Sequence, residues 1–177
     1  MKKIVLIGAE STGKTTMAKQ LAKYYNTIFL HEYAREYIEN LKRNYCYKDL
    51  IKISKKQIEL ENKYKKKANK YFFLDTDLII TKIWFLEVFK KIPYFLEKKI
   101  LENKADLYLI MATDIKWEFD KTRENGNQKI RNYLQNLYEK ELINYNFNYE
   151  IIKGKNEKRF ENALLKIENF FSKKIIF

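Results

Sequence analysis

The fold of this chain is decided near its start, by Gly8-Ala9-Glu10-Ser11-Thr12-Gly13-Lys14-Thr15. This stretch fits G-x-x-x-x-G-K-[ST], the phosphate-binding P-loop pattern, which is informative when it lies between a strand and a helix. Here the apolar run Ile4-Val5-Leu6-Ile7 precedes it, and a helical pattern begins at Thr15. A chance glycine turn is the alternative, but the chain has only four glycines and two of them fall at this spacing. The stretch therefore predicts a site for a nucleoside triphosphate.

The P-loop pattern also predicts what its individual residues bind. The backbone N–H groups of such a loop converge on the phosphates of ATP, and the dipole of the following helix adds to the attraction. Lys14 is expected to reach the β- and γ-phosphates, while the hydroxyl of Thr15 is expected to bind Mg²⁺. The residues of this segment expected to bind ATP are Gly8, Glu10, Ser11, Thr12, Gly13, Lys14, Thr15 and Thr16.

Length and composition narrow the class of protein. With 177 residues, of which 46% are hydrophobic and 16% aromatic, the chain is expected to form one domain over residues 1–177, large enough for a single core. Its single cysteine, Cys46, excludes an internal disulfide and fits a reducing compartment. The apolar run after Lys3 is too short for a signal-peptide core, and no run approaches the roughly 20 residues of a membrane helix. We therefore expect a cytoplasmic protein with no membrane partner.

The charge raises the question of a nucleic-acid partner, because the net charge is +13. Only five of the 36 basic residues are arginines, and the lysines are scattered over positions expected to face solvent. A run such as Lys65-Lys66-Lys67 is then a solvated helix face. We do not expect nucleic acid as a partner, and the sequence leaves the oligomeric state open.

Short apolar runs alternate with helical patterns along the chain. This alternation predicts an α/β P-loop NTPase fold, in which a five-stranded parallel sheet has helices on both faces. The expected strands are 4–7, 27–30, 71–74, 107–111 and 149–152. The expected helices are 15–25, 33–43, 49–69, 78–91, 94–103, 128–145 and 157–171. The polar segment 113–131 lacks a sustained apolar period, and a segment of that length is expected to be a functional lid.

Acidic residues follow two of the expected strands, at the edge where parallel sheets bind ligands. Glu32 is placed to orient an acceptor hydroxyl as a general base, or it is only an acid at a helix N-terminus. Asp75 follows four apolar residues, the Walker B arrangement, and is expected to help hold Mg²⁺. Asp77 either binds ribose hydroxyls or caps the next helix. This set of carboxylates favours a kinase over a protein that only binds nucleotide.

Arginines and aromatic residues complete the candidate site. Arg35 is placed to bind phosphate or to pair with an aspartate after the third strand. Arg123 and Arg131 flank the lid, where they are expected to bring positive charge to the transferring phosphoryl group and to ATP. Trp117 either stacks on a flat, electron-poor ring or packs in the core. The chain's only histidine, His31, is expected to be a packing residue because Glu32 beside it already suits the role of base.

Together these residues resemble the ribosylnicotinamide kinase domain of the NadR-type NAD-salvage proteins, an AAA-like P-loop ATPase. Besides the P-loop, the matching pieces are Glu32-Tyr33-Ala34-Arg35-Glu36-Tyr37, Asp75-Thr76-Asp77, Trp117-Glu118-Phe119-Asp120 with Arg123, and Arg159-Phe160. The resemblance implies a nucleoside-kinase-like fold and ATP-dependent phosphorylation of the ribose 5′-hydroxyl of nicotinamide riboside. It also implies that Trp117 contacts the nicotinamide and that Asp77 or Glu32 contacts the ribose. The expected acceptor-site residues are Glu32, Tyr33, Arg35, Asp77, Trp117 and Asp120.

The sequence departs from the family pattern in the lid. Lys116 stands before the lid tryptophan, where proline is usual, and Lys121-Thr122 replaces small or proline residues. We expect no adenylyltransferase domain of the kind found in bifunctional members, so that a partner enzyme would complete NAD synthesis. Two alternatives stay open: a kinase for another nucleoside or a nucleoside monophosphate, and a nucleotide-dependent regulatory ATPase.

Overall fold

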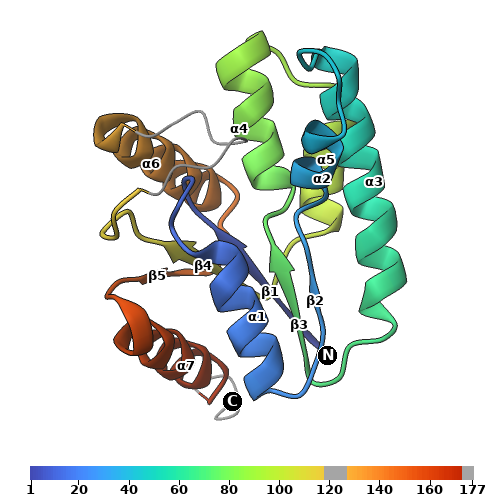
Figure 1. The fold of residues 1–177 in the computed structure, drawn as a ribbon. Coiled ribbons are helices and arrows are strands. Elements are labelled where there is room, and N and C mark those ends of the chain that lie inside the picture. The colour runs from blue at the N-terminus through green and yellow to red at the C-terminus, as the bar shows by residue number, and fades with distance from the viewer. Residues whose placement is uncertain (118–126, 173–177) are drawn as a thin grey trace.

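The computed structural model describes residues 1–117 and 127–172. Within them, one sheet forms from β1 (Lys2–Ile7), β2 (Phe29–Leu30), β3 (Tyr71–Asp75), β4 (Leu107–Met111) and β5 (Tyr149–Ile152). The strand order is β2-β3-β1-β4-β5, and every neighbouring pair is parallel. The strand that precedes the P-loop therefore lies at the centre of the sheet (Figure 1).

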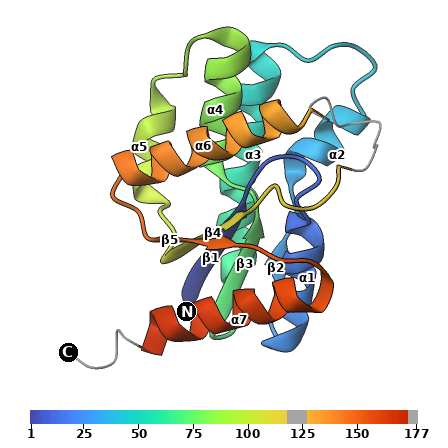
Figure 2. The same cartoon turned by 90° about the vertical axis from the view of Figure 1, so that its left-hand side faces the viewer.

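Helices cover both faces of this sheet. The helices are α1 (Lys14–Tyr24), α2 (Tyr33–Glu39), α3 (Tyr47–Lys65), α4 (Leu78–Phe89), α5 (Phe95–Glu102), α6 (Gln128–Asn144) and α7 (Asn156–Ser172). Apolar residues of α1 and α7 pack in the core on one face, and those of α3, α4, α5 and α6 pack on the other. Figure 2 shows α6 and α7 on opposite sides of the sheet.

The central strands carry continuous apolar runs because both of their faces are buried. Side chains alternate between the two faces of a strand. In β1, Val5 and Ile7 join the core under α3 to α6, whereas Ile4 and Leu6 join the core under α1 and α7. Leu6 pairs with Asp75 of β3 on one side and with Leu109 of β4 on the other. The P-loop therefore leaves the sheet between the carboxyl ends of β3 and β4.

The predicted five-stranded parallel sheet with helices on both faces is confirmed, and several boundaries differ from expectation. The third helix ends at Lys65 rather than at 69, the first strand begins at Lys2 rather than at 4, and the second strand is only Phe29–Leu30. The third helix begins at Tyr47 rather than at 49, because Asp49 acts from inside the first turn and accepts a hydrogen bond from the Cys46 backbone N–H at 2.8 Å. The second helix ends at Glu39 rather than at 43, where the Asn40 side chain donates to the carbonyl of Glu36 at 2.8 Å. In the part of the chain that the structure describes, no helix combines the length and apolarity needed to cross a bilayer.

Candidate active site

The P-loop has a backbone shape that depends on its two glycines. Gly8 has φ of 148°, and a Cβ atom there would lie 2.7 Å from the carbonyl oxygen of Met111. Gly13, just before α1, has φ of 78°. Such φ values are strained for residues with side chains. The Thr12 hydroxyl donates to the carbonyl of Ala9 at 2.8 Å and closes the loop on itself.

The chemical groups of the loop meet the end of β3. Lys14 Nζ donates to the carbonyl oxygens of Gly8 and Ala9, both at 3.0 Å. The Thr15 hydroxyl donates to Asp75 Oδ2 at 2.5 Å. The other carboxylate oxygen, Oδ1, is buried and forms no hydrogen bond with the described residues. Burial raises the pKa of Asp75, and the charge of Lys14 opposes that rise.

Arg131, on the first turn of α6, is 1% exposed and binds backbone carbonyls of the loop. Its Nε donates to Glu10 at 3.1 Å, and its Nη2 donates to Ser11 at 3.2 Å. Its Nη1 donates to the carbonyl of Ile115 at 3.0 Å and to Gln128 Oε1 at 2.8 Å. Arg131 does not line the cavity described below, so in this structure its guanidinium holds the loop, and its expected contact with ATP stays a prediction.

Arg159, on α7, holds the same loop from the other side and is 5% exposed. Its Nη2 donates to the carbonyls of Thr12 at 3.2 Å and Ala112 at 2.7 Å. Its Nη1 donates to Asp114 Oδ1 at 2.5 Å and to the carbonyl of Gly154 at 2.8 Å. The sequence showed Arg159 only as part of the resemblance. Its role depends on contacts with residues far away in the chain.

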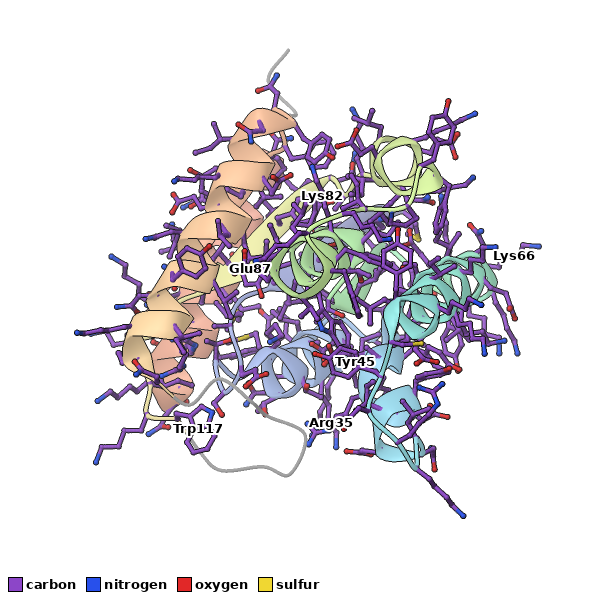
Figure 3. All side chains as sticks on the ribbon, turned by 90° about the horizontal axis from the view of Figure 1, so that it is seen from above. Arg35, Tyr45, Lys66, Lys82, Glu87 and Trp117 are labelled. Atoms are coloured by element: carbon purple, nitrogen blue, oxygen red, sulfur yellow. The ribbon has the colours of Figure 1, made fainter. Side chains whose placement is uncertain are left out.

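A cavity of about 540 Å³ opens in front of the loop and runs from it, past Glu32 and Arg35, to the facing sides of α4 and α6. Figure 3 shows Glu87 on the side of α4 that faces α6, and shows Arg35 and Tyr45 nearer to α2 and α3. The cavity brings together most of the residues expected to form the site: Gly8, Glu10, Ser11, Thr12, Gly13, Lys14, Thr15, Thr16, Glu32 and Arg35.

Glu32 precedes α2, but its side chain makes no capping hydrogen bond with that helix. Burial raises the pKa of Glu32 to about 7, and the nearby charges of Asp75 and Glu10 add to the rise. The positive charges of Lys14 and Arg35 oppose it. A carboxylate with a pKa near neutrality can accept a proton and release it again, which suits a general base.

Asp77 was expected in the acceptor site, but the structure places its side chain outside the cavity. Its Oδ1 accepts from the backbone N–H of Ile79 at 2.9 Å and caps α4, while its Oδ2 accepts from the Tyr108 hydroxyl at 3.0 Å. Asp77 is buried and does not line the cavity. Thr76 between the two aspartates has φ of 70°, and the two carboxylates have different partners, Thr15 for Asp75 and Tyr108 for Asp77. The alternative that Asp77 caps a helix therefore holds.

Other expected acceptor residues lie away from the cavity or outside the described part of the chain. Neither Tyr33 nor Trp117 is among the residues that line the cavity. Asp120 and Arg123 lie outside the described residues. Sequence reasoning missed the aromatic end of the cavity, which contains Tyr45, Trp84, Tyr133 and Tyr138. Trp84, Tyr133 and Tyr138 lie on helices, where aromatic residues are equally typical of core packing, and Tyr45 lies in the loop before α3.

The chain is a P-loop protein of the α/β class. Four features define it: the central strand, the loop shaped by two glycines, the helix that follows the loop, and the aspartate on the neighbouring strand. Residues 3–159 match the family model AAA_28, described as an AAA domain. The chain belongs to this family.

Sequence comparison with individual proteins identifies more specific relatives. The chain is 28% identical over 160 residues to the trifunctional NAD biosynthesis/regulator protein NadR of Salmonella typhimurium, which covers 86% of this chain and 38% of that protein. The protein of the same name from Escherichia coli is 29% identical over 144 residues, covering 77% of this chain and 34% of the relative. The chain thus spans less than two fifths of the length of these relatives. The expected resemblance to NadR-type proteins is confirmed.

Solved structures share the fold. The structure of NadR protein in complex with NR has a TM-score of 0.78 at 20% identity, with 97% of this chain and 51% of that chain covered. NadR protein in complex with NAD and AMP-PNP has a TM-score of 0.77 at 23% identity, with 97% and 49% covered. Deoxyadenosine kinase from M. mycoides has a TM-score of 0.64 at 16% identity, with 94% and 99% covered.

Proposed function

We propose that residues 1–177 act as an ATP-dependent kinase domain, which phosphorylates the ribose 5′-hydroxyl of nicotinamide riboside to give nicotinamide mononucleotide. The observation that carries this proposal is the continuous cavity, which joins the P-loop to a compartment between α4 and α6 with Glu32 beside the loop. The NadR name of the relatives, and the NR bound in one NadR structure, support this choice of acceptor.

On the donor side, we assign the P-loop N–H groups and Lys14 to the phosphates of ATP. The Lys14 ammonium now bonds the carbonyls of Gly8 and Ala9, at the mouth of the loop where the phosphates would bind. Arg131 and Arg159 keep the loop in shape through its carbonyls, so its N–H groups are oriented before ATP arrives. Preorganised donors of this kind stabilise the charge that develops during phosphoryl transfer.

On the acceptor side, Glu32 accepts the proton of the 5′-hydroxyl as its oxygen bonds to the γ-phosphorus. The bond between that phosphorus and the β–γ bridging oxygen breaks, and ADP leaves with the electron pair. The proton passes from Glu32 to solvent after product release. Arg123 and Asp120 stay predicted contributors from outside the described residues, and Trp117 stays a predicted contact of the nicotinamide.

The residues present fit a Mg²⁺ ion. Thr15 and Asp75 share a hydrogen bond at the foot of the loop, and the buried Asp75 Oδ1 has an unused acceptor position. Carboxylates and hydroxyls are ligands that Mg²⁺ takes together with nucleotide phosphates. We propose that Thr15 and Asp75 hold the ion, the carboxylate directly or through water. When bound, the ion neutralises charge on the phosphates.

A panel of acceptors with coupled detection of ADP tests the proposal. We expect rapid turnover with nicotinamide riboside and slow turnover with purine and pyrimidine nucleosides. Turnover with a deoxynucleoside or a nucleoside monophosphate, and none with nicotinamide riboside, would show a kinase for another acceptor. Slow ATP hydrolysis that no acceptor stimulates would instead indicate a regulatory ATPase.

A further inference from the structure

The far end of the cavity is formed by one face of α4 and one face of α6. The lining residues of α4 recur at intervals of three and four, as do those of α6, so each set forms a single stripe along its helix. The α4 stripe is Ile80, Ile83, Trp84, Glu87 and Val88, and the α6 stripe is Ile130, Tyr133, Leu134 and Tyr138.

Glu87 is the one charged side chain in these two stripes of described residues. Its carboxylate accepts a hydrogen bond from the Tyr133 hydroxyl at 3.2 Å. Its negative charge also helps to raise the pKa of Tyr138, after burial and the charges of Glu32 and Glu10. Trp84, one helical turn away on α4, donates from its indole to the Tyr45 hydroxyl at 3.1 Å. The Glu87 carboxylate therefore contacts one aromatic side chain, and three others line the same cavity.

Among the residues that the structure describes, the positive charges of the site lie away from Glu87. Lys14 and Arg35 line the cavity from the P-loop and from α2. Lys82, although it is also on α4, bonds Glu141 and Tyr145 and is not among the lining residues. In the described part of the chain, no ion pair joins Glu87 to a lysine or arginine, and its hydrogen bond is to a neutral hydroxyl. A partly buried carboxylate without a cation leaves room for a cationic ligand.

We propose that Glu87 determines acceptor specificity by selecting a nucleoside whose base carries a positive charge. The inference rests on the proposed function, in which the 5′-hydroxyl lies at Glu32 and the base points away from the P-loop toward α4 and α6. The pyridinium ring of nicotinamide riboside is flat and cationic. Aromatic faces and a carboxylate both attract such a ring, whereas a neutral purine or pyrimidine gains nothing from the charge.

The test compares two acceptors that differ in ring charge, nicotinamide riboside and its uncharged 1,4-dihydro form. Glu87→Gln keeps the size and hydrogen-bonding capacity of the side chain and removes its charge. We expect kcat/KM for nicotinamide riboside to fall about tenfold, and kcat/KM for the dihydro form to change by less than about twofold. Glu157→Gln is the matched control, because it removes one negative charge from an exposed position on α7 and should change neither value.

A second measurement uses the wild-type protein alone, so it does not depend on the folding of a variant. The cation 1-methylnicotinamide should compete with nicotinamide riboside more strongly than neutral nicotinamide, by about fivefold or more. Equal losses for both acceptors in Glu87→Gln, or equal competition by the two ring compounds, would overturn the role of Glu87. If wild-type protein does not phosphorylate nicotinamide riboside at all, the proposed function fails instead, which is a distinguishable result.

Discussion

The protonation state of Glu32 should control the rate of the proposed reaction. The proposed base must be ionised to accept a proton, and burial raises the pKa of Glu32 to about 7. We therefore expect kcat/KM to be low at pH 6 and to rise through pH 7 to a plateau. A pH–rate profile of the wild-type protein measures this rise. Glu32→Gln should lower kcat/KM by about 100-fold or more and lose the rise, and a profile unchanged in shape would exclude Glu32 as the base.

The same carboxylate should lower the stability of the folded protein at high pH. The folded-state pKa of Glu32, about 7, lies above its ordinary value of 4.5. The favourable contribution of protonated Glu32 is therefore complete below pH 4.5 and is lost as the pH rises through 7. Glu32→Gln removes this loss, so we expect its Tm to exceed that of the wild type at pH 8, with little difference at pH 5. Thermal melts at both pH values measure the change, and an equal shift at both would contradict the linkage.

How far single residues could be predicted depended on whether their role was local. The placement of Asp75 and Glu32 near the P-loop could be predicted because each stands at the carboxyl end of a strand, whereas their roles stay predictions. Asp77 could not be assigned, because an aspartate at that position suits both ribose binding and helix capping. Only its contact with Tyr108, 31 residues further along, distinguishes the two. Arg131 also has the position expected of a phosphate ligand, and only its hydrogen bonds to the carbonyls of Glu10 and Ser11 show that it contacts the loop backbone.

Among the elements, α7 supports the site through a single buried side chain. Arg159 bonds the carbonyls of Thr12, Ala112 and Gly154, and its removal would leave these buried acceptors without partners. We expect Arg159→Ala to lower the free energy of unfolding by about 2–4 kcal/mol and to raise KM for ATP. Urea denaturation and steady-state kinetics measure the two effects.

Lys158→Ala is a suitable control for Arg159→Ala, because Lys158 is an exposed neighbour on the same helix. It should leave both quantities near their wild-type values. An Arg159→Ala variant that unfolds like the wild type would contradict the role assigned to this side chain.

Elements of regular structure were predictable because their apolar patterns are strong. The strands β3 and β4 are predictable to within one residue of their ends, since continuous apolar runs mark buried parallel strands. The predicted start of α3 is two residues late, because Asp49 accepts a hydrogen bond from the Cys46 backbone N–H from inside the first turn of the helix. The stripes of α4 and α6 had the spacing of a core-facing surface, and no local signal shows that the space between them is a cavity.

At the scale of the whole molecule, binding of Mg²⁺ and ATP should stabilise the fold. A ligand at 100 times its Kd adds about 2.7 kcal/mol to the free energy of unfolding. We expect a clear rise in Tm with ATP and Mg²⁺, a smaller rise with ATP and EDTA, and no difference between these conditions in Asp75→Asn. Differential scanning fluorimetry measures all three.

Lys14→Ala should lose most of the ATP-dependent rise in Tm and all turnover. Lys19→Ala, an exposed position on the same helix, should behave like the wild type. An active Lys14→Ala protein would rule out the proposed mechanism.

The overall architecture could be predicted from the alternation of strands and helices, but the neighbours within the sheet could not. Alternation predicts parallel strands, whereas the order β2-β3-β1-β4-β5 depends on which crossover each helix makes. That order is what brings Asp75 beside the P-loop. The dispersed positive charge does not help to predict the strand order, since net charge describes solubility and association rather than fold.

The two arginines that hold the P-loop also affect when the nucleotide site can exist. Arg131 binds Glu10 across 121 residues, and Arg159 binds Thr12 across 147 residues. During synthesis the loop leaves the ribosome before α6 and α7, so its carbonyls receive these partners only after both helices have emerged. The loop of a nascent chain is therefore not yet preorganised for ATP. Retention on ATP resin would separate chains that include α7 from chains stalled before it.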